Sequence, residues 1–301
     1  ATSPTTAPIP GNLCHDELTI LNRGMGHLLG QPDLGTDSNP LGPATIVSAF
    51  SEAGYRTWWI SNQMTVSQWD NGISIYAEEA HIRRYLNMAG FGSRSDHDEV
   101  LLPELERALK DPASNRFIVL HTLGSHFNYR NRYPDSFDRF QPSLAVGERT
   151  TIFDMDKRVE LGNAYDNSIL YTDHFLAEVV RRLESAGGDS VMLYTADHGE
   201  SLFEGTCFKA GHGVTSATNF HVPFMIWMSD GARARAPSVW SAILSNRDRP
   251  ITAESIFPTL VALGGLNLRV LAVFGAVEEK DVAGIMRTIH PVVDHLYAVR
   301  A

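Results

Sequence analysis

The sequence has little cysteine, little net basic charge and no long uninterrupted apolar run. Its two cysteines, Cys14 and Cys207, are too few for a disulfide scaffold and lack the paired CxxC spacing of a structural zinc site. Whether they form one disulfide or stay as thiols is left open by the sequence. Lys and Arg total 25 against 35 Asp and Glu, and the formal charge of −10 offers no basic surface for a phosphate backbone. We therefore expect no nucleic-acid partner.

The most apolar region, residues 256–277, is interrupted by Pro258, Asn267 and Arg269. It falls short of the ~20 consecutive apolar residues that a bilayer helix needs, so no membrane span is expected within these residues. The chain also does not open with a basic and then apolar leader. Its 43% apolar and 20% charged content is that of a folded globular protein. We expect a soluble domain that belongs to a longer polypeptide.

Helical and strand patterns alternate along the chain. Residues 43–53 predict a helix that ends at Gly54, and the aromatic run at 55–60 predicts a strand. The same order recurs downstream, with helices predicted over 98–110 and 161–183 and apolar strands over 117–120 and 191–195. Helices that alternate with buried strands predict an α/β fold with a mainly parallel central sheet covered on both faces.

Polar residues that follow such strands are the first candidates for a site, because ligands bind beyond the carboxyl ends of parallel strands. Asp197 and His198 come directly after the strand predicted at 191–195, and Gly199 permits a tight turn that aims both at one point. Carboxylate oxygen and imidazole nitrogen are ligands that zinc accepts. The plainer interpretation is that Asp197 caps a following helix and His198 is an ordinary surface residue.

Further histidines favour the metal interpretation. His126 follows the strand predicted at 117–120, and His212 lies between two glycines fourteen residues after His198. The remaining histidines that we considered are expected to be hydrogen-bonded packing residues, and they are His15, His27, His81, His97 and His121. Residues 128–148 and 205–219 show no clear period and are expected to be long loops near the site.

Several segments together resemble the phosphoethanolamine transferases of the alkaline phosphatase and sulfatase superfamily. The segment Ala196-Asp-His-Gly-Glu-Ser201 is similar to their metal motif, and similar stretches occur in the same order elsewhere in the chain, at residues 54–63, 120–126, 165–173, 211–213 and 256–260. We expect one catalytic domain over residues 1–301. Residues 1–266 match the family pattern, and residues 267–301 are an unassigned C-terminal part.

The resemblance implies a zinc-dependent double displacement at the periplasmic face of a bacterial inner membrane. A threonine takes phosphoethanolamine from phosphatidylethanolamine and passes it to lipid A or another envelope glycan. Thr6 is assigned as this nucleophile, with Thr5 as the close alternative and a disordered Thr/Pro linker as the plainer interpretation. The implied metal ligands are Thr6, Asp197 and His198. His126 and His212 match the substrate-side histidines, and Asn62 matches a position that meets the phosphoethanolamine group.

One part of the family pattern is missing. The family's metal site also uses a carboxylate from a strand upstream of the nucleophile, and nothing before Thr6 resembles it. We expect that this strand and the N-terminal membrane domain lie outside the 301 residues. Two alternatives stay open, a hydrolase of the same superfamily and a metal-poor remnant without catalysis. A sulfatase is disfavoured, because no Cys-x-Pro-x-Arg or Ser-x-Pro-x-Arg motif is present.

Overall fold

The computed structural model describes residues 45–64, 71–87, 96–204, 208–212, 217–249, 251–266, 271–276 and 295–300. The predicted nucleophile, Thr6 or Thr5, and the possible disulfide between Cys14 and Cys207 lie outside these residues.

Three parallel strands form the largest sheet. Strand β1 (Arg56–Ser61) lies in the middle, between β2 (Ile82–Tyr85) and β3 (Arg116–His121). All of β1 from Thr57 onward is buried, which suits a strand paired on both edges and covered on both faces.

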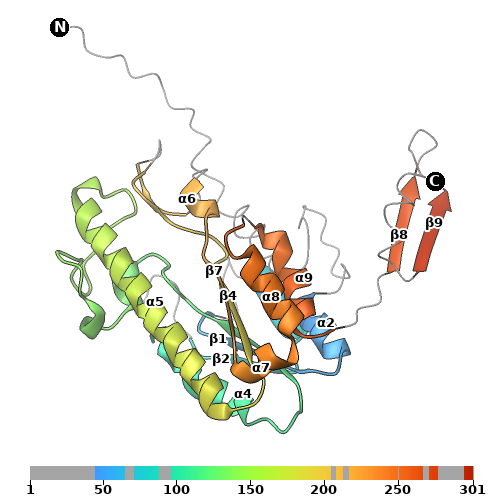
Figure 1. Cartoon of the computed structure of the whole chain (residues 1–301). Helices are drawn as coiled ribbons and strands as arrows, with labels where there is room; N and C mark the ends of the chain where they lie inside the picture. The colour runs from blue at the N-terminus through green and yellow to red at the C-terminus, as the bar shows by residue number, and fades with distance from the viewer. Residues whose placement is uncertain are drawn as a thin grey trace.

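A second pair of strands lies in the same layer of the molecule (Figure 1). Strand β4 (Val191–Thr195) pairs antiparallel with β7 (Phe224–Met228), in a register that sets Leu193 opposite Ile226. The α/β fold with a parallel central sheet is therefore confirmed, and β4 with β7 forms a separate antiparallel pair.

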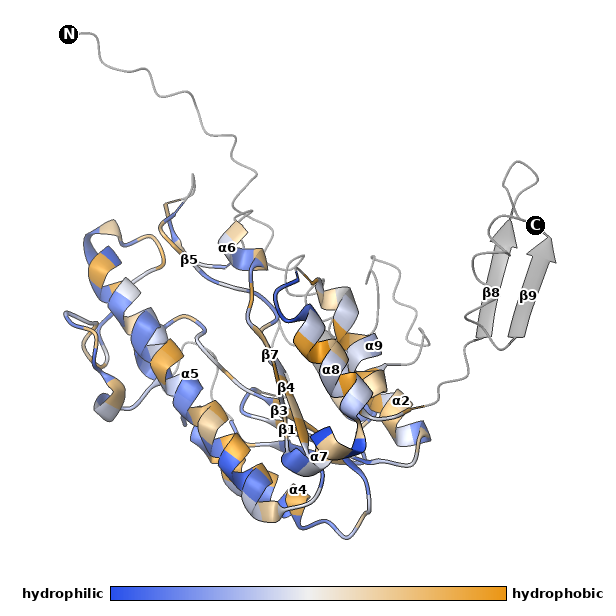
Figure 2. Cartoon of the chain, in the orientation of Figure 1, coloured by the Kyte–Doolittle hydropathy of each residue, from blue (hydrophilic) through white to orange (hydrophobic). Residues whose placement is uncertain are grey.

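Helices cover both faces of this layer. On one side lie α4 (Leu101–Leu109) and α5 (Arg158–Ala186), and on the other α2 (Ile46–Glu52), α8 (Pro237–Asn246) and α9 (Ile256–Leu263) (Figure 1). Apolar residues concentrate in the strands between the helices, whereas the outer side of α5 is largely polar (Figure 2). Burial of apolar side chains from both helix layers against the strands provides the main stabilisation of this fold.

Local signals set the helix boundaries. The α2 helix begins at Ile46, because the Thr45 hydroxyl accepts a hydrogen bond from the Ser48 amide at 3.2 Å, a standard N-cap. It ends before Gly54, whose φ of 84° is readily adopted by glycine alone. The long α5 likewise ends at Gly187, with φ 68°. The predicted helices and strands are confirmed within a few residues at each end.

The remaining described elements are short. They are α3 (Asn71–Glu78), β5 (Ser201–Leu202), β6 (Ala210–Gly211), α6 (Ala217–Phe220), α7 (Asp230–Arg235), β8 (Leu271–Ala276) and β9 (His295–Arg300), with 3₁₀ turns at Asp98–Val100, Tyr129–Arg132, Asp135–Phe137, Met155–Lys157 and Ala253–Ser255. Among the described residues, no helix combines the length and apolar character required to cross a membrane.

Candidate active site

Asp197 and His198 lie at the carboxyl end of β4, as the sequence predicts. The Asp197 carboxylate oxygen Oδ1 accepts a hydrogen bond from the His198 amide at 3.0 Å and lies 3.9 Å from His198 Nε2. No helix follows this pair, because the chain continues into the short strand β5. The capping interpretation of Asp197 is therefore wrong, and its carboxylate and the imidazole are held beside each other.

Gly199 lets the chain pass close to another backbone segment. A Cβ atom at this position would lie 2.1 Å from the carbonyl oxygen of Thr218. The approach is held by hydrogen bonds from the Gly199 amide to the Asn219 carbonyl at 2.8 Å and from Asn219 Nδ2 to the Gly199 carbonyl at 3.2 Å. The glycine is thus required by close contact with the backbone of α6.

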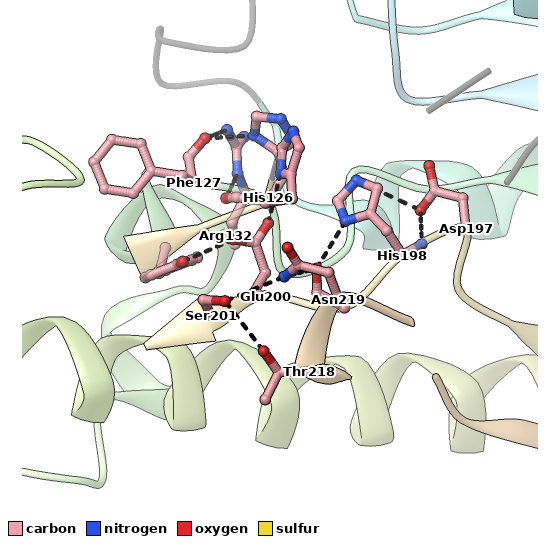
Figure 3. Close-up of polar contacts among 12 residues, drawn as sticks. His126, Phe127, Arg132, Asp197, His198, Glu200, Ser201, Thr218 and Asn219 are labelled. Carbon is pink, nitrogen blue, oxygen red and sulfur yellow. Dashed lines mark hydrogen bonds and ion pairs between the residues drawn. The ribbon is translucent and has the colours of Figure 1, made fainter. Parts of the chain in front are cut away.

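His212 reaches the same point from a different segment. Strand β6 pairs antiparallel with β5, so that Gly211 faces Ser201 and the His212 ring lies 4.1 Å from the His198 ring, centroid to centroid. The His212 Nδ1 atom is 3.0 Å from Glu200 Oε1, and the other carboxylate oxygen accepts a hydrogen bond from the Tyr129 hydroxyl at 2.9 Å. Figure 3 shows Glu200 close to the labelled residues His126, His198 and Asn219.

Glu200 is a candidate site residue that the sequence pattern did not single out. Its side chain is 5% exposed, and its two oxygens contact His212 and Tyr129. A carboxylate that accepts Nδ1–H fixes the tautomer of an imidazole and stabilises its charged form. The signal available was its place in the motif, two residues after His198.

His126 completes the set of imidazoles, from the loop that follows β3. Its ring lies 5.2 Å from the His212 ring. Its Nδ1 atom is 2.5 Å from the Phe127 carbonyl, and Arg132 Nε donates to the His126 carbonyl at 2.8 Å (Figure 3). Burial, followed by the charges of His212 and Arg132, lowers the pKa of His126 to about 4. The ring is therefore neutral near pH 7, with Nε2 as a proton acceptor when Nδ1 holds the proton.

Asp98 anchors the loop that carries His126. Its buried carboxylate accepts hydrogen bonds at 2.9 Å from Asn62 Nδ2 and from the amides of Leu123 and Gly124. Burial raises the pKa of this carboxyl group, while these hydrogen bonds and the charge of Arg132 lower it. One carboxylate thus joins the ends of β1 and β3.

Asn62 lies in this anchor and is 0% exposed. Its amide nitrogen also donates to the Asp96 carbonyl at 3.0 Å, and its carbonyl oxygen Oδ1 is buried without a hydrogen-bond partner within the described residues. The structure therefore gives Asn62 a bracing position behind the histidines. Its contact with substrate stays a prediction.

Of the histidines predicted to be hydrogen-bonded packing residues, His81, His97 and His121 are described and each has a partner, although His81 is exposed, whereas His15 and His27 lie outside the described residues. His121 stays within β3, with Nδ1 3.0 Å from the Ser61 hydroxyl, and burial lowers its pKa to about 4. His81 lies 2.7 Å from the Thr57 hydroxyl, and the His97 ring contacts Tyr171.

The side chains present fit a zinc ion. Ligand atoms of His198, Glu200 and His212 all lie within 4.8 Å of one another, and Asp197 is adjacent. His198 Nδ1 lies 3.0 Å from the Gly199 carbonyl, which leaves Nε2 for a metal, and an outer partner of this kind is typical of zinc-binding histidines. Because both oxygens of Glu200 are already engaged, Asp197 and His198 are the better ligands. Of the three predicted ligands, the structure brings these two together.

These groups line one end of a cavity of about 1080 Å³. Its lining includes His126, Asp197, His198, Glu200 and His212, and it continues between β3 and β4. The site therefore opens beyond the carboxyl ends of the strands, where α/β folds bind their ligands.

A sheet of this kind, with zinc-type ligands and imidazoles converging beyond its strands, is the architecture of the alkaline phosphatase and sulfatase class. The chain belongs to the sulfatase family, whose profile matches residues 14–266.

Named relatives and a solved structure refine this assignment. The chain is 27% identical over 233 residues to phosphoethanolamine transferase EptC of Escherichia coli, covering 74% of this chain and 38% of the relative. It is 37% identical over 139 residues to the Kdo(2)-lipid A phosphoethanolamine 7''-transferase of the same species, covering 44% of this chain and 23% of the relative. The zinc complex of the C-terminal periplasmic domain of the E. coli EptC protein superposes with a TM-score of 0.64 at 25% identity, covering 75% of this chain and 62% of that one. The chain thus spans about four tenths of the length of EptC.

Proposed function

We propose that this chain is the catalytic domain of a zinc-dependent phosphoethanolamine transferase at the periplasmic face of a bacterial inner membrane. The donor is phosphatidylethanolamine, and the acceptor is lipid A or another envelope glycan. The observation that carries the proposal is the convergence of Asp197, His198, His126 and His212 on one cavity. Similarity to EptC and to its zinc-bound domain supports the choice of group transferred and of metal.

Asp197, His198 and Thr6 would hold the zinc ion, whose positive charge would activate the Thr6 hydroxyl and offset the charge of the phosphoryl oxygens. The Thr6 oxygen attacks the phosphorus atom, and the bond from phosphorus to the diacylglycerol oxygen breaks. The acceptor hydroxyl then attacks the same phosphorus and releases Thr6.

The two histidines divide the proton transfers. His212, paired with Glu200, is suited to carry a proton and deliver it to the departing diacylglycerol oxygen. His126, whose pKa is lowered to about 4, is suited to accept the proton of the acceptor hydroxyl in the second step. The carboxylate partner of His212 and the lowered pKa of His126 thus suit the two rings to opposite tasks.

Incubation with phosphatidylethanolamine labelled in its ethanolamine group tests the proposal. We expect the label to appear on the protein at Thr6, as read by peptide mass spectrometry, and to be lost from Thr6→Ala but kept in Thr5→Ala. Release of the label as free phosphoethanolamine, with no labelled threonine, would instead indicate a hydrolase. Zinc below about a tenth of an equivalent after dialysis, together with no labelling, would identify a metal-poor remnant.

A further inference from the structure

The loop that follows His126 connects the candidate active site to α5. We call residues 127–140 the site loop. Near its beginning the Tyr129 hydroxyl donates a hydrogen bond to Glu200 at 2.9 Å, and Arg132 Nε donates to the His126 carbonyl at 2.8 Å. The end of the loop is bonded to α5 and lies beside it (Figure 1). What fixes this end therefore bears on the residues that support both imidazoles.

Asn167 of α5 is the residue that holds the end of the site loop. Its side chain is 0% exposed. The Oδ1 atom accepts hydrogen bonds from the amides of Arg139 and Phe140, both at 2.8 Å. The Nδ2 atom donates to Asp138 Oδ1 at 2.9 Å and to the Phe140 carbonyl at 3.1 Å. A side-chain amide has two acceptor lone pairs and two donor hydrogens, and all four are used here.

The loop, and not the helix, explains why residue 167 is an asparagine. Asparagine is a weak helix former, because its side chain competes with the backbone for hydrogen bonds, yet Asn167 lies well inside α5. An aspartate there would keep the acceptor but turn a second carboxylate toward Asp138. An apolar residue would leave the buried amides of the loop without their acceptor, which is costly. The asparagine thus matches the contacts of the loop.

Tyr133 joins the end of the site loop to its beginning. Its buried hydroxyl donates to Asp138 Oδ1 at 3.2 Å and lies 3.4 Å from Asn167 Nδ2. Its carbonyl accepts a hydrogen bond at 3.2 Å from Arg130, whose guanidinium lies 4.8 Å from the centre of the Tyr133 ring. Arg132 directly precedes Tyr133 in the chain. A shift of Tyr133 is therefore passed on to the guanidinium that contacts the candidate site.

Arg132 and Tyr129 are the residues of the site loop that reach the candidate site, and both belong to one 3₁₀ turn. Arg132 is buried, and its Nη2 atom also donates to the Phe127 carbonyl at 3.2 Å. Tyr129 is buried and packs edge-on against Tyr165 of α5. Close-packed side chains on one turn cannot shift singly, so a displacement of the turn moves both. The supports of the two histidines thus depend on a single backbone segment.

We propose that Asn167 is a positioning residue for the transfer reaction. It holds the site loop against α5, so that Arg132 stays bonded to the His126 carbonyl. By the same contact Tyr129 stays bonded to Glu200. Asn167 is not among the residues that line the cavity, so it acts only through the loop. The inference rests on the proposed function for the reaction that Asn167 serves, whereas its effect on the place of His126 can be measured without that reaction.

Asn167→Asp and Asn163→Asp form a matched pair of variants. Asn163 lies one turn earlier on α5, is partly exposed and donates a single hydrogen bond to the Pro142 carbonyl at 2.7 Å. In Asn167→Asp we expect kcat to fall about a hundredfold and KM to change less than about twofold, because a small displacement of catalytic groups costs this much. Asn163→Asp should keep kcat within about twofold of the parent. Equal kcat in the two variants, or a change in KM alone, overturns the proposal.

A double variant tests whether the hydrogen bonds of Asn167 carry the effect. Asp138→Asn combined with Asn167→Asp exchanges the amide and the carboxylate, so that one side chain again donates to the other. The amides of Arg139 and Phe140 keep a carboxylate acceptor in this variant. We expect kcat to recover to within about tenfold of the parent, as coupled partners do in a mutant cycle. A double variant that unfolds in urea like the parent but is as slow as Asn167→Asp overturns the proposal.

Nuclear magnetic resonance of the His126 ring tests the inference without the reaction. Its ring signal in zinc-free protein, assigned by its absence in His126→Gln, should move in Asn167→Asp, return in the double variant and stay in place in Asn163→Asp. Tyr133→Phe removes only the hydroxyl that joins the two parts of the loop, so it should move the signal in the same direction even if Asn167→Asp does not fold.

The two measurements separate this inference from the proposed function. If the parent chain transfers no phosphoethanolamine, the proposed function fails, and the His126 signal still decides whether Asn167 positions the site. A signal that stays at its parent position in Tyr133→Phe and in every folded Asn167 variant overturns the inference.

Discussion

His126 and His212, the two histidines proposed to face the substrate, differ in the residues that contact them. His212 lies on a short β-ribbon and faces a carboxylate that is itself fixed by Tyr129. His126 lies in a loop, bonded to backbone carbonyl and backed by the buried cation Arg132. His212 therefore faces an anion, whereas burial and nearby positive charge lower the pKa of His126. The comparison indicates that the residues in contact with each histidine determine how readily its ring takes up a proton.

Mutation of Asp98, which anchors the loop that carries His126, should have the largest effect on the free energy of unfolding. Asp98→Asn keeps the size of the side chain but removes the charge that faces Arg132 and accepts the Leu123 and Gly124 amides. Leaving buried backbone amides without the acceptor that Asp98 provides costs about 1–3 kcal/mol. Urea unfolding should show a loss of this size.

The neighbouring carboxylate provides the control for Asp98. Glu99 pairs with His174 at the surface, and Glu99→Gln should change the unfolding free energy by less than about 1 kcal/mol. Equal effects of the two substitutions would show that Asp98 is not an anchor.

For His212, whose partner is Glu200, the substitution Glu200→Gln should impair transfer without unfolding the protein. The amide cannot stabilise a proton on His212, so we expect kcat to fall about a hundredfold, in the range of a lost acid–base contribution. The acidic and basic limbs of the rate profile should also move, which loss of packing alone would not cause. A change in KM with kcat and pH profile intact would contradict this role.

The buried neutral histidines predict a pH dependence of stability. The pKa of His126 is lowered from 6.5 to about 4, so between these values the unfolded chain binds a proton that the folded chain does not. Stability is full above pH 6.5 and is lost as the pH falls toward 4, by about 2–3 kcal/mol for one such group. Urea unfolding of zinc-free protein measures this slope.

His121 should contribute to the same loss, because burial lowers its pKa to about 4 as well. His126→Gln and His121→Gln should each flatten the slope between pH 6.5 and 4. If both variants keep the slope of the parent chain, the two rings are protonated in the folded state.

Sequence patterns predicted the parts of this molecule that depend on local runs. The sequence pattern alone predicts where β1, β3, β4 and α5 lie, because in each case the pattern extends over the whole element. β2, which reads Ile-Arg-Arg-Tyr, was missed, since an edge strand needs no continuous apolar run. The roles of Glu200 and Asp98 were missed for a different reason. Each depends on residues far away along the chain, Tyr129 and Leu123, whose contacts no local pattern encodes.

Removal of the Tyr129 hydroxyl should have the smallest effect on kcat. It also separates the residues that hold His212 from those that hold His126. Tyr129→Phe keeps a ring that packs edge-on against Phe127 and Tyr165, but takes away one of the two donors to Glu200. A buried hydrogen bond to a charged group contributes about 1.5–3 kcal/mol, part of which water recovers, so kcat should fall roughly tenfold. The pH profile should shift in the same direction as in Glu200→Gln. Tyr165→Phe, which alters the adjacent ring, is the matched control and should leave that profile unchanged. In the double variant Glu200→Gln with Tyr129→Phe, the two losses should not add, because Tyr129 acts on His212 only through the carboxylate.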